Sequence, residues 1–316
     1  MKNKKHTTQE TNTPYDDVHR TMLNDCPKLI IPVVNEMFHK RHSNNEKVTL
    51  LNNELFINGQ NGKQMERITD TNLLIGSIRY HLECQSTADG TIMYRIFEYD
   101  SQLALQNSEM SEDKLTVNFP NTAVLYLRHN KETPDQMKIE ICVPRAACSY
   151  SVPVMKVQSY SIEEIFEKNL LFLIPFHIFS YEKHFKEYET DEYKLQELTK
   201  VYEGIVDRLN EYAKEHKIDE YTRITIIDMS KKVLEHLAKK YSNVKERVGA
   251  IMGGKILDYE AKDILNTGRA EGRAEHLTNQ VKKKLEKNMS VNEIAETLEE
   301  DVDVIKELIA KLQKES

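Results

Sequence analysis

The sequence predicts a mixed α/β core followed by a helical C-terminal region, and three observations support this. Between Arg67 and Asp100 the chain reads as a strand, a tight turn near Gly76-Ser77, a second strand and the start of a helix. Further strand-like runs follow as far as residue 157. From Ser161 onward, apolar residues recur at helical spacing almost to the end of the chain.

The first fifty residues predict an arm, two helices and the beginning of an extended segment. Residues 1–13 are polar and have no apolar periodicity, so we expect a disordered arm. Pro14 and the two aspartates that follow Tyr15 are typical of the first turn of a helix. The apolar segment Leu29–Phe38 is expected to be helical after Pro32, and Val48–Ile57 to be a strand or extended segment.

Beyond the central hairpin, the remaining elements follow from apolar spacing. Ile92–Leu105 has apolar or aromatic residues at near-helical spacing, and Ser161 with Glu164 matches a capping box that begins a helix. Strands are expected at 115–119, 123–127, 137–141 and 150–157, and helices at 161–180, 190–216, 220–242 and 258–288, with two more within 290–314.

These elements predict five successive parts of the chain. They are a disordered arm (1–13), an α/β core (14–160), a helical region that completes or packs on the core (161–255), a long charged helix (256–289) and a small unit resembling a helix-turn-helix (290–316). The presumed recognition helix of the last unit begins E-E-D-V-D, which would repel phosphates. We therefore expect it to serve packing or self-association, giving a homo-oligomer through the helical tail.

Composition excludes several classes of protein. Hydrophobic residues make up 39% and charged residues 30% of the 316 residues, as in a globular protein with exposed helices. The four cysteines show no C-x-x-C spacing, so we expect reduced thiols rather than zinc or disulfides. The longest apolar run, Leu170–Phe179, is about half the roughly 20 residues of a membrane span, and no signal peptide is evident. A cytoplasmic protein without membrane contact is predicted.

The net charge of −7 is unevenly distributed. Residues 1–160 contain 18 Lys and Arg against 19 Asp and Glu, whereas the rest contains 26 against 32. A nearly neutral N-terminal half can still present a basic face, so nucleic acid remains compatible with the sequence.

The central hairpin carries candidate metal ligands. Glu83 and Gln85 are two residues apart on the second strand and share a face, while Leu82 and Cys84 face the core. Antiparallel pairing across the turn can bring Asp70 beside Glu83. Two converging carboxylates with a neighbouring amide suggest a site for one divalent metal ion, although two acids on adjacent strands are also typical of a solvated sheet edge.

Several motifs in this order resemble one enzyme superfamily. They are Y-D-D-V-H-R-T-M-L from Tyr15, I-T-D at 68–70, H-L-E-C-Q-S at 81–86, R-I-F-E-Y-D at 95–100, I-P-F-H-I-F at 174–179 and G-R-A-E-G-R-A-E at 268–275. Together they resemble the PD-(D/E)XK nucleases, and within them the putative transposases and recombination-promoting nucleases of the Rpn type. The resemblance implies a restriction-endonuclease-like core of helix, three-stranded meander, helix and strand, with a mixed sheet flanked by helices.

The resemblance also assigns roles to individual residues. Asp70 and Glu83 correspond to the acidic metal ligands, and the backbone carbonyl of Cys84 to a third ligand of Mg²⁺, for which Mn²⁺ is expected to substitute. Gln85 stands where many members have lysine, and it would orient the attacking water without supplying a positive charge.

Other residues have two interpretations. Arg95 and Tyr99, and less directly Arg20, are candidates for contact with the DNA backbone, although Arg95 and Tyr99 are equally suited to pack the helix onto the sheet. His19, His81 and His177 are interpreted as structural, with His81 sharing the face of Glu83.

The expected function is that of a Mg²⁺-dependent DNA endonuclease of a transposase-like, recombination-promoting family with low sequence specificity. One alternative is a catalytically weak or inactive nuclease-fold protein that binds DNA or a protein partner. Another is a toxin or defence effector of a bacterial mobile element that uses the same site.

Overall fold

A computed structural model describes most of the chain, in two units that each have a hydrophobic core. The units are Met1–Ile256 and Leu257–Ser316. The described residues are 14–51, 54–58, 64–68, 71–87, 90–253, 277–282, 284–285, 289–298, 300 and 302–314.

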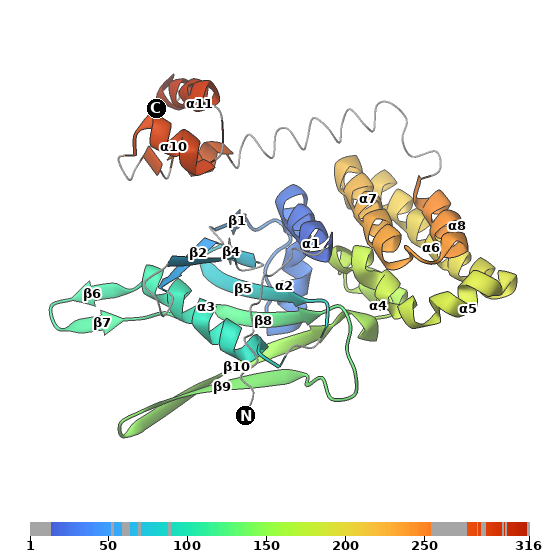
Figure 1. Ribbon diagram of the computed structural model, residues 1–316, viewed down its shortest axis with the longest axis horizontal. Coiled ribbons are helices and arrows are strands. Elements are labelled where there is room, and N and C mark those ends of the chain that lie inside the picture. The colour runs from blue at the N-terminus through green and yellow to red at the C-terminus, as the bar shows by residue number, and fades with distance from the viewer. Residues whose placement is uncertain are drawn as a thin grey trace, which may run out of the picture. The chain divides into compact units, whose positions relative to one another are not determined.

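A six-stranded mixed sheet forms the centre of the first unit (Figure 1). Its strands lie in the order β1-β4-β5-β8-β10-β9. The pairs β1–β4, β4–β5 and β9–β10 are antiparallel, and the pairs β5–β8 and β8–β10 are parallel. The bounds are β1 Val48–Leu50, β4 Thr71–Ile75, β5 Ile78–Gln85, β8 Asn121–Tyr126, β9 Gln136–Val143 and β10 Ala146–Lys156.

The β4–β5 hairpin confirms the predicted strand, turn and strand. Gly76 adopts a φ of +60°, which glycine tolerates without steric cost, and it allows the chain to reverse between the two strands. The described register runs from Ile75 opposite Ile78 to Thr71 opposite Leu82. The first strand is shorter than expected, because β4 begins at Thr71 rather than near Arg67.

Helices cover both faces of the sheet. Helix α3 (Ile92–Gln106) lies on one face, where Ile92 and Ile96 pack against Val124 and Tyr126 of β8 (Figure 1). Helices α1 (Pro14–Asp25) and α2 (Ile30–Phe38) pack on the other face, against a core that includes Leu82. The alternation of side chains along each strand therefore supplies two cores.

Two small antiparallel sheets interrupt this arrangement. Strands β2 (Glu54–Asn58) and β3 (Gln64–Ile68) come between β1 and β4 in the sequence and pair with each other in a separate sheet. The extended segment predicted at 48–57 therefore divides into β1 and β2. Strands β6 (Glu109–Ser111) and β7 (Lys114–Thr116) form a hairpin after α3, so most of the strand predicted at 115–119 lies outside the main sheet. The predictions at 123–127, 137–141 and 150–157 are confirmed as β8, β9 and β10.

The segment from 161 to 180 is not one helix as predicted. Helix α4 ends at Glu167, and Asn169 adopts a left-handed φ of +56°. A 3₁₀ segment, η3, then covers Leu171–Ser180 around Pro175, whose missing N–H and bulky ring disfavour a continuous α-helix. The capping box at the start of α4 is present as predicted, with Ser161 and Glu164 bonding each other's backbone.

Helices complete the first unit and share the core on the face of the sheet that α1 and α2 cover. Aromatic residues of η3 are fully buried there together with residues of α1, α6 and α7. The remaining bounds are α4 Ile162–Glu167, α5 Phe185–Thr190, α6 Glu192–Lys214, α7 Glu220–Leu237 and α8 Ser242–Gly253, with short 3₁₀ turns η1 Pro27–Leu29, η2 Val157–Ser159 and η4 Glu182–His184. Helix α8 was not predicted, and α7 ends five residues before the expected boundary at 242.

The second unit contains the two short helices expected near the C-terminus, α10 (Val291–Leu298) and α11 (Val302–Lys314). Ser290 and Glu293 bond each other at the start of α10, as its capping box predicts. Of the helix predicted at 258–288, only residues 277–282 and 284–285 are described, and they are helical. No helix among the described residues combines the length and the apolar character needed to cross a bilayer.

Candidate functional site

A network of charged side chains lies between the sheet and α3. His81 of β5 is at its centre, with Nδ1 2.7 Å from Oδ1 of Asp100 and Nε2 3.0 Å from Oε1 of Glu83. The guanidinium of Arg95 donates to Oε2 of Glu83 at 3.1 Å. Asp100 is fully buried, and Glu83 is 2% exposed.

The local pattern of β5 explains why His81 and Glu83 meet α3. The two residues are two positions apart on the strand, so both side chains point to the same face. The intervening Leu82 and the following Cys84 are buried in the core on the opposite face, as predicted. Arg95 and Asp100 approach from α3, which follows directly after the hairpin in the chain.

The two acids stabilise a positive charge on His81. Burial alone would lower the pKa of the imidazole, but the hydrogen bonds and negative charges of Asp100 and Glu83 raise it to about 9. At pH 7 the imidazole of His81 is therefore a cation, and with Arg95 it faces the acidic side chains of Glu83 and Asp100. This balance explains how four ionisable groups remain buried together.

Asp100 is anchored by two further strands of the sheet. The hydroxyl of Thr122 on β8 donates to Oδ1 at 2.6 Å, and the hydroxyl of Tyr150 on β10 donates to Oδ2 at 2.9 Å. Both oxygens of Asp100 thus accept hydrogen bonds from residues far apart in the sequence. Burial and the negative charge of Asp100 raise the pKa of Tyr150, so its hydroxyl stays a donor.

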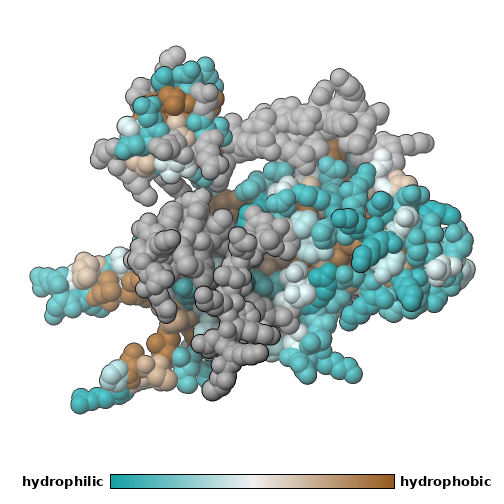
Figure 2. Space-filling model, in the orientation of Figure 1, coloured by the Kyte–Doolittle hydropathy of each residue, from teal (hydrophilic) through white to brown (hydrophobic). Residues whose placement is uncertain are grey.

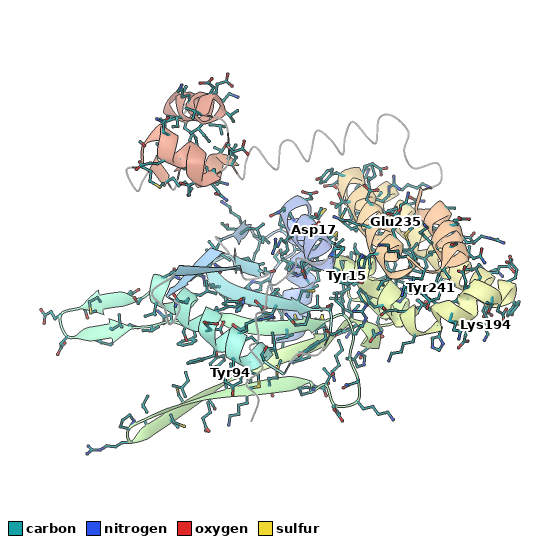
Figure 3. The ribbon with its side chains drawn as sticks, viewed as in Figure 1. Tyr15, Asp17, Tyr94, Lys194, Glu235 and Tyr241 are labelled. Carbon is teal, nitrogen blue, oxygen red and sulfur yellow. The ribbon has the colours of Figure 1, made fainter. Side chains whose placement is uncertain are left out.

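Replacing Tyr150 by Phe should lower the free energy of unfolding by about 1.5–3 kcal/mol, since it removes a hydrogen bond to a buried charge. Urea denaturation at pH 7 measures this change. Tyr94→Phe is the matched control, because Tyr94 lies on α3 with its side chain 80% exposed (Figure 3). Equal stabilities of the two variants would show that the Tyr150 hydroxyl contributes nothing to the network.

The structure locates most of the predicted metal ligands, but not all. Asp70 lies outside the described residues, so its predicted approach to Glu83 stays a prediction. Gln85 follows Glu83 on the same face and is half-buried, as a residue at the end of β5. The side chain of Cys84 is buried in the core, which is compatible with its predicted contribution through the backbone carbonyl alone.

Carboxylate, amide and carbonyl oxygens are the donors that Mg²⁺ prefers, so these residues fit the ion in kind. Oε1 of Glu83 is bonded to His81 and Oε2 to Arg95, so an ion at this carboxylate would share it with both cations. No group of three or more His, Cys, Asp or Glu suited to a metal occurs among the described residues, which do not include Asp70. The described donors are therefore compatible with a metal but supply one carboxylate of the predicted pair.

Of the two interpretations of Tyr99, the structure supports packing of the helix on the sheet. The Tyr99 ring is 1% exposed and packs at 5.9 Å from the ring of His81, so it joins α3 to the sheet. Arg95 is 17% exposed and bonded to Glu83, which places it within the network. Arg20 is half-buried on α1, where its charge helps to lower the pKa of the neighbouring His19.

The histidines differ in role. Burial lowers the pKa of His19 and of His177 to about 4, so both are neutral and structural, as predicted. His81 was expected to be structural as well, but its two carboxylate partners make it the centre of the network. Asp100, Thr122 and Tyr150 were not predicted. Position 100 does belong to the helical stripe that contains Ile96 and Tyr99, and an acid in that stripe was the signal to follow.

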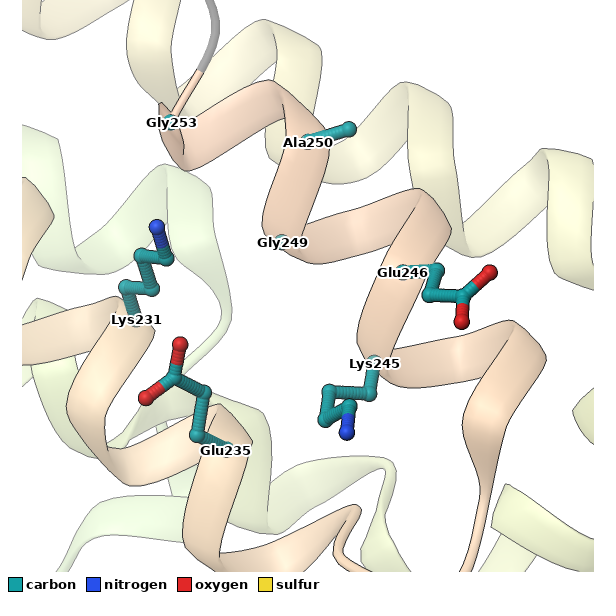
Figure 4. Close-up of a pocket in the computed structure, with 7 residues that line it drawn as sticks. All are labelled: Lys231, Glu235, Lys245, Glu246, Gly249, Ala250 and Gly253. Atoms are coloured by element: carbon teal, nitrogen blue, oxygen red, sulfur yellow. The ribbon is translucent and has the colours of Figure 1, made fainter.

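A shallow groove of about 590 Å³ between α7 and α8 is an alternative location for a ligand (Figure 4). Its lining includes two lysines, Lys231 and Lys245, and two acids, Glu235 and Glu246. This groove has side chains of both charges on its surface, but it lacks a set of buried polar groups that converge on one point, as in the network beneath α3. We therefore place the candidate site at Glu83.

Comparisons with family models, with curated proteins and with solved structures gave no match to this chain.

Proposed function

We propose that this chain is a Mg²⁺-dependent DNA endonuclease of the transposase-like, recombination-promoting kind that its motifs resemble. The observation that carries the proposal is the order of elements around Glu83. Helix α1, the antiparallel meander β1-β4-β5, helix α3 and the parallel strand β8 occur in this order along the chain, with α2 after α1 and the pairs β2–β3 and β6–β7 inserted. This is the order that the resemblance implies, with Glu83 on the third strand of the meander.

The chain's own residues would prepare Glu83 for this role. His81 and Arg95 each bond one carboxylate oxygen, which fixes the orientation of the side chain. Asp100 in turn orients His81 and compensates its charge. Glu83 is thus held by a supporting shell whose own members are bonded to three strands and one helix.

In this proposal Asp70, Glu83 and the carbonyl of Cys84 hold Mg²⁺, which would make a bound water easier to deprotonate and offset charge on the phosphate. Gln85, next on the same face, would orient that water through its amide. Because Gln85 carries no charge, cleavage should be slower and more dependent on the metal than with a lysine at this position.

Nicking of supercoiled plasmid by the purified full-length chain tests the proposal, with Mg²⁺, Mn²⁺ or EDTA. We expect nicking with either metal, none with EDTA, and at least a roughly hundredfold loss in Glu83→Gln and in Asp70→Asn. Glu203→Gln is the matched control, because Glu203 is an exposed acid on α6. Equal activity in all four proteins would contradict the assignment.

Glu83→Gln also disturbs a buried ion pair, so folding must be measured in parallel. Circular dichroism melting shows whether the variant keeps a cooperative transition above the assay temperature. Binding of Mn²⁺, followed by its paramagnetic resonance signal, separates loss of the metal from loss of the fold.

One observation favours a second candidate function, that of a nuclease-fold protein which binds DNA or a partner and cuts little. Both oxygens of Glu83 already accept bonds from cations, and a metal must compete with these charges. A folded chain that binds DNA but neither binds Mn²⁺ nor nicks plasmid would establish this alternative.

A further inference from the structure

Strand β9 is the last strand of the six-stranded sheet. It pairs with β10 on one side, and no described strand pairs with its other side. With β10 it forms a long hairpin that projects from the body and carries exposed apolar residues such as Val143 (Figures 1 and 2). A free edge presents backbone N–H and C=O groups that can pair with another strand.

The side chains of β9 alternate between a buried and an exposed face. Met137 and Ile139 are buried towards α3, whereas Lys138 and Glu140 are exposed. Neither charged residue forms an ion pair with any residue that the structure describes. On β10, Ser151 lies opposite Lys138 and Ser149 lies opposite Glu140, and neither serine carries a charge.

We propose that the β9 edges of two copies of this chain pair antiparallel and form a homodimer with one continuous sheet. A two-fold axis at Ile139 places Lys138 of one protomer opposite Glu140 of its partner, and the reverse. Each dimer then gains two cross-strand pairs of opposite charge on the exposed face, and Met137 lies opposite Ile141 on the buried face.

The charge pattern selects this register over its neighbours. A two-fold axis perpendicular to the sheet pairs residues whose side chains lie on the same face of the sheet. The axis must therefore pass at a residue of β9 and not between two residues, so alternative registers differ by one residue in the position of the axis. An axis at Lys138 would place this lysine opposite itself, and an axis at Glu140 would do the same for the glutamate. Ile139 is therefore the position that turns both charges into attractive pairs.

Edge charges can also serve to prevent pairing, and the two roles are distinguishable. A charge that prevents edge pairing disfavours any incoming strand, whatever charges that strand carries. The self-complementary arrangement instead predicts that reversing one charge is harmful and that reversing both is not.

Analytical ultracentrifugation of the full-length chain over a range of concentrations tests this directly. We expect the native chain to form a dimer. The dissociation constant should be about tenfold larger for Lys138→Glu or Glu140→Lys, and it should return to the native value in the double reversal. A monomeric native chain would overturn the proposal. So would a dimer that ignores the single reversals, since it would form through another surface such as the second unit.

The register can be tested by cross-linking. An axis at Ile139 places position 136 of one protomer opposite Cys142 of its partner, and both residues are exposed. Gln136→Cys should therefore form a disulfide-linked dimer under mild oxidation, seen on a non-reducing gel. The native chain and the double variant Gln136→Cys with Cys142→Ser should not. Cross-linking that is equal in all three would reject this register, and absence of cross-linking in Gln136→Cys would reject it as well.

Discussion

Replacing Asp100 by Asn should lower the free energy of unfolding of the first unit by about 3–5 kcal/mol at pH 7, the cost of breaking a buried ion pair. The change leaves the shape of the side chain but removes the charge that compensates His81. Asp100 is fully buried and accepts bonds from His81, Thr122 and Tyr150, so no solvent replaces what is lost. For a unit of this size the melting temperature should fall by roughly 10 °C.

The same variant should change how stability depends on pH. His81 has a pKa raised from 6.5 to about 9 in the folded chain, because its bonds to Asp100 and Glu83 outweigh its burial. Its contribution is thus fully present below pH 6.5 and is lost as the pH rises through 9, a change on the order of 3 kcal/mol. Asp100→Asn should abolish most of this decline.

Urea denaturation between pH 6 and pH 9.5 measures both effects. Glu203→Gln provides the control, because it removes an exposed carboxylate of α6 and should change stability by no more than about 0.5 kcal/mol. If Asp100→Asn kept the native stability and the native pH profile, the charged state of the His81 network would be refuted.

Replacing Phe172 by Ala should destabilise the first unit by about 3–5 kcal/mol, the usual cost of removing a buried aromatic ring. Phe172 lies in η3 and is fully buried, with its ring edge-on to His19 of α1 at 5.4 Å. Because η3 shares one core with α1 and the sheet, the loss should appear in the unfolding of the whole unit. A single transition should therefore move to lower temperature.

Thermal unfolding is followed by far-ultraviolet circular dichroism and by tyrosine fluorescence. Coincident curves in the native chain and in the variant would agree with a single cooperative unit. Tyr193→Ala, at a side chain that is 70% exposed on α6, should leave the transition within about 1 °C of the native one. Two separate transitions, with only the helical one affected, would instead show that residues 161–255 fold independently of the sheet.

Local patterns were enough to predict much of this molecule. The alternation of β5 identified which side chains face the core, and Gly76 identified the hairpin turn. The two capping boxes, at Ser161 and at Ser290, correctly located the starts of helices. Each of these features depends on residues within a few positions of one another, where propensity and periodicity act directly.

The errors arose where distant contacts compete with local preference. The segment around Pro175 is apolar on every side, so its sequence indicated a buried helix without showing that it winds as a 3₁₀ segment. For Tyr99 the sequence left DNA contact and packing equally open, and the packing of α3 on β5 buries it. Neither outcome can be read from spacing, because each depends on which elements become neighbours.

By itself, the sequence determined the β4–β5 hairpin, the strands β8, β9 and β10, the faces of β5 and the position of Glu83 on the second strand of the hairpin. Only the tertiary structure decided that His81 lies between Asp100 and Glu83, and that Asp100 bonds to Tyr150, 50 residues further along the chain. The physical reason is that strand order, not local propensity, brings β5, β8 and β10 side by side beneath α3. Once they are neighbours, the burial of one charge requires the others to be bonded to it.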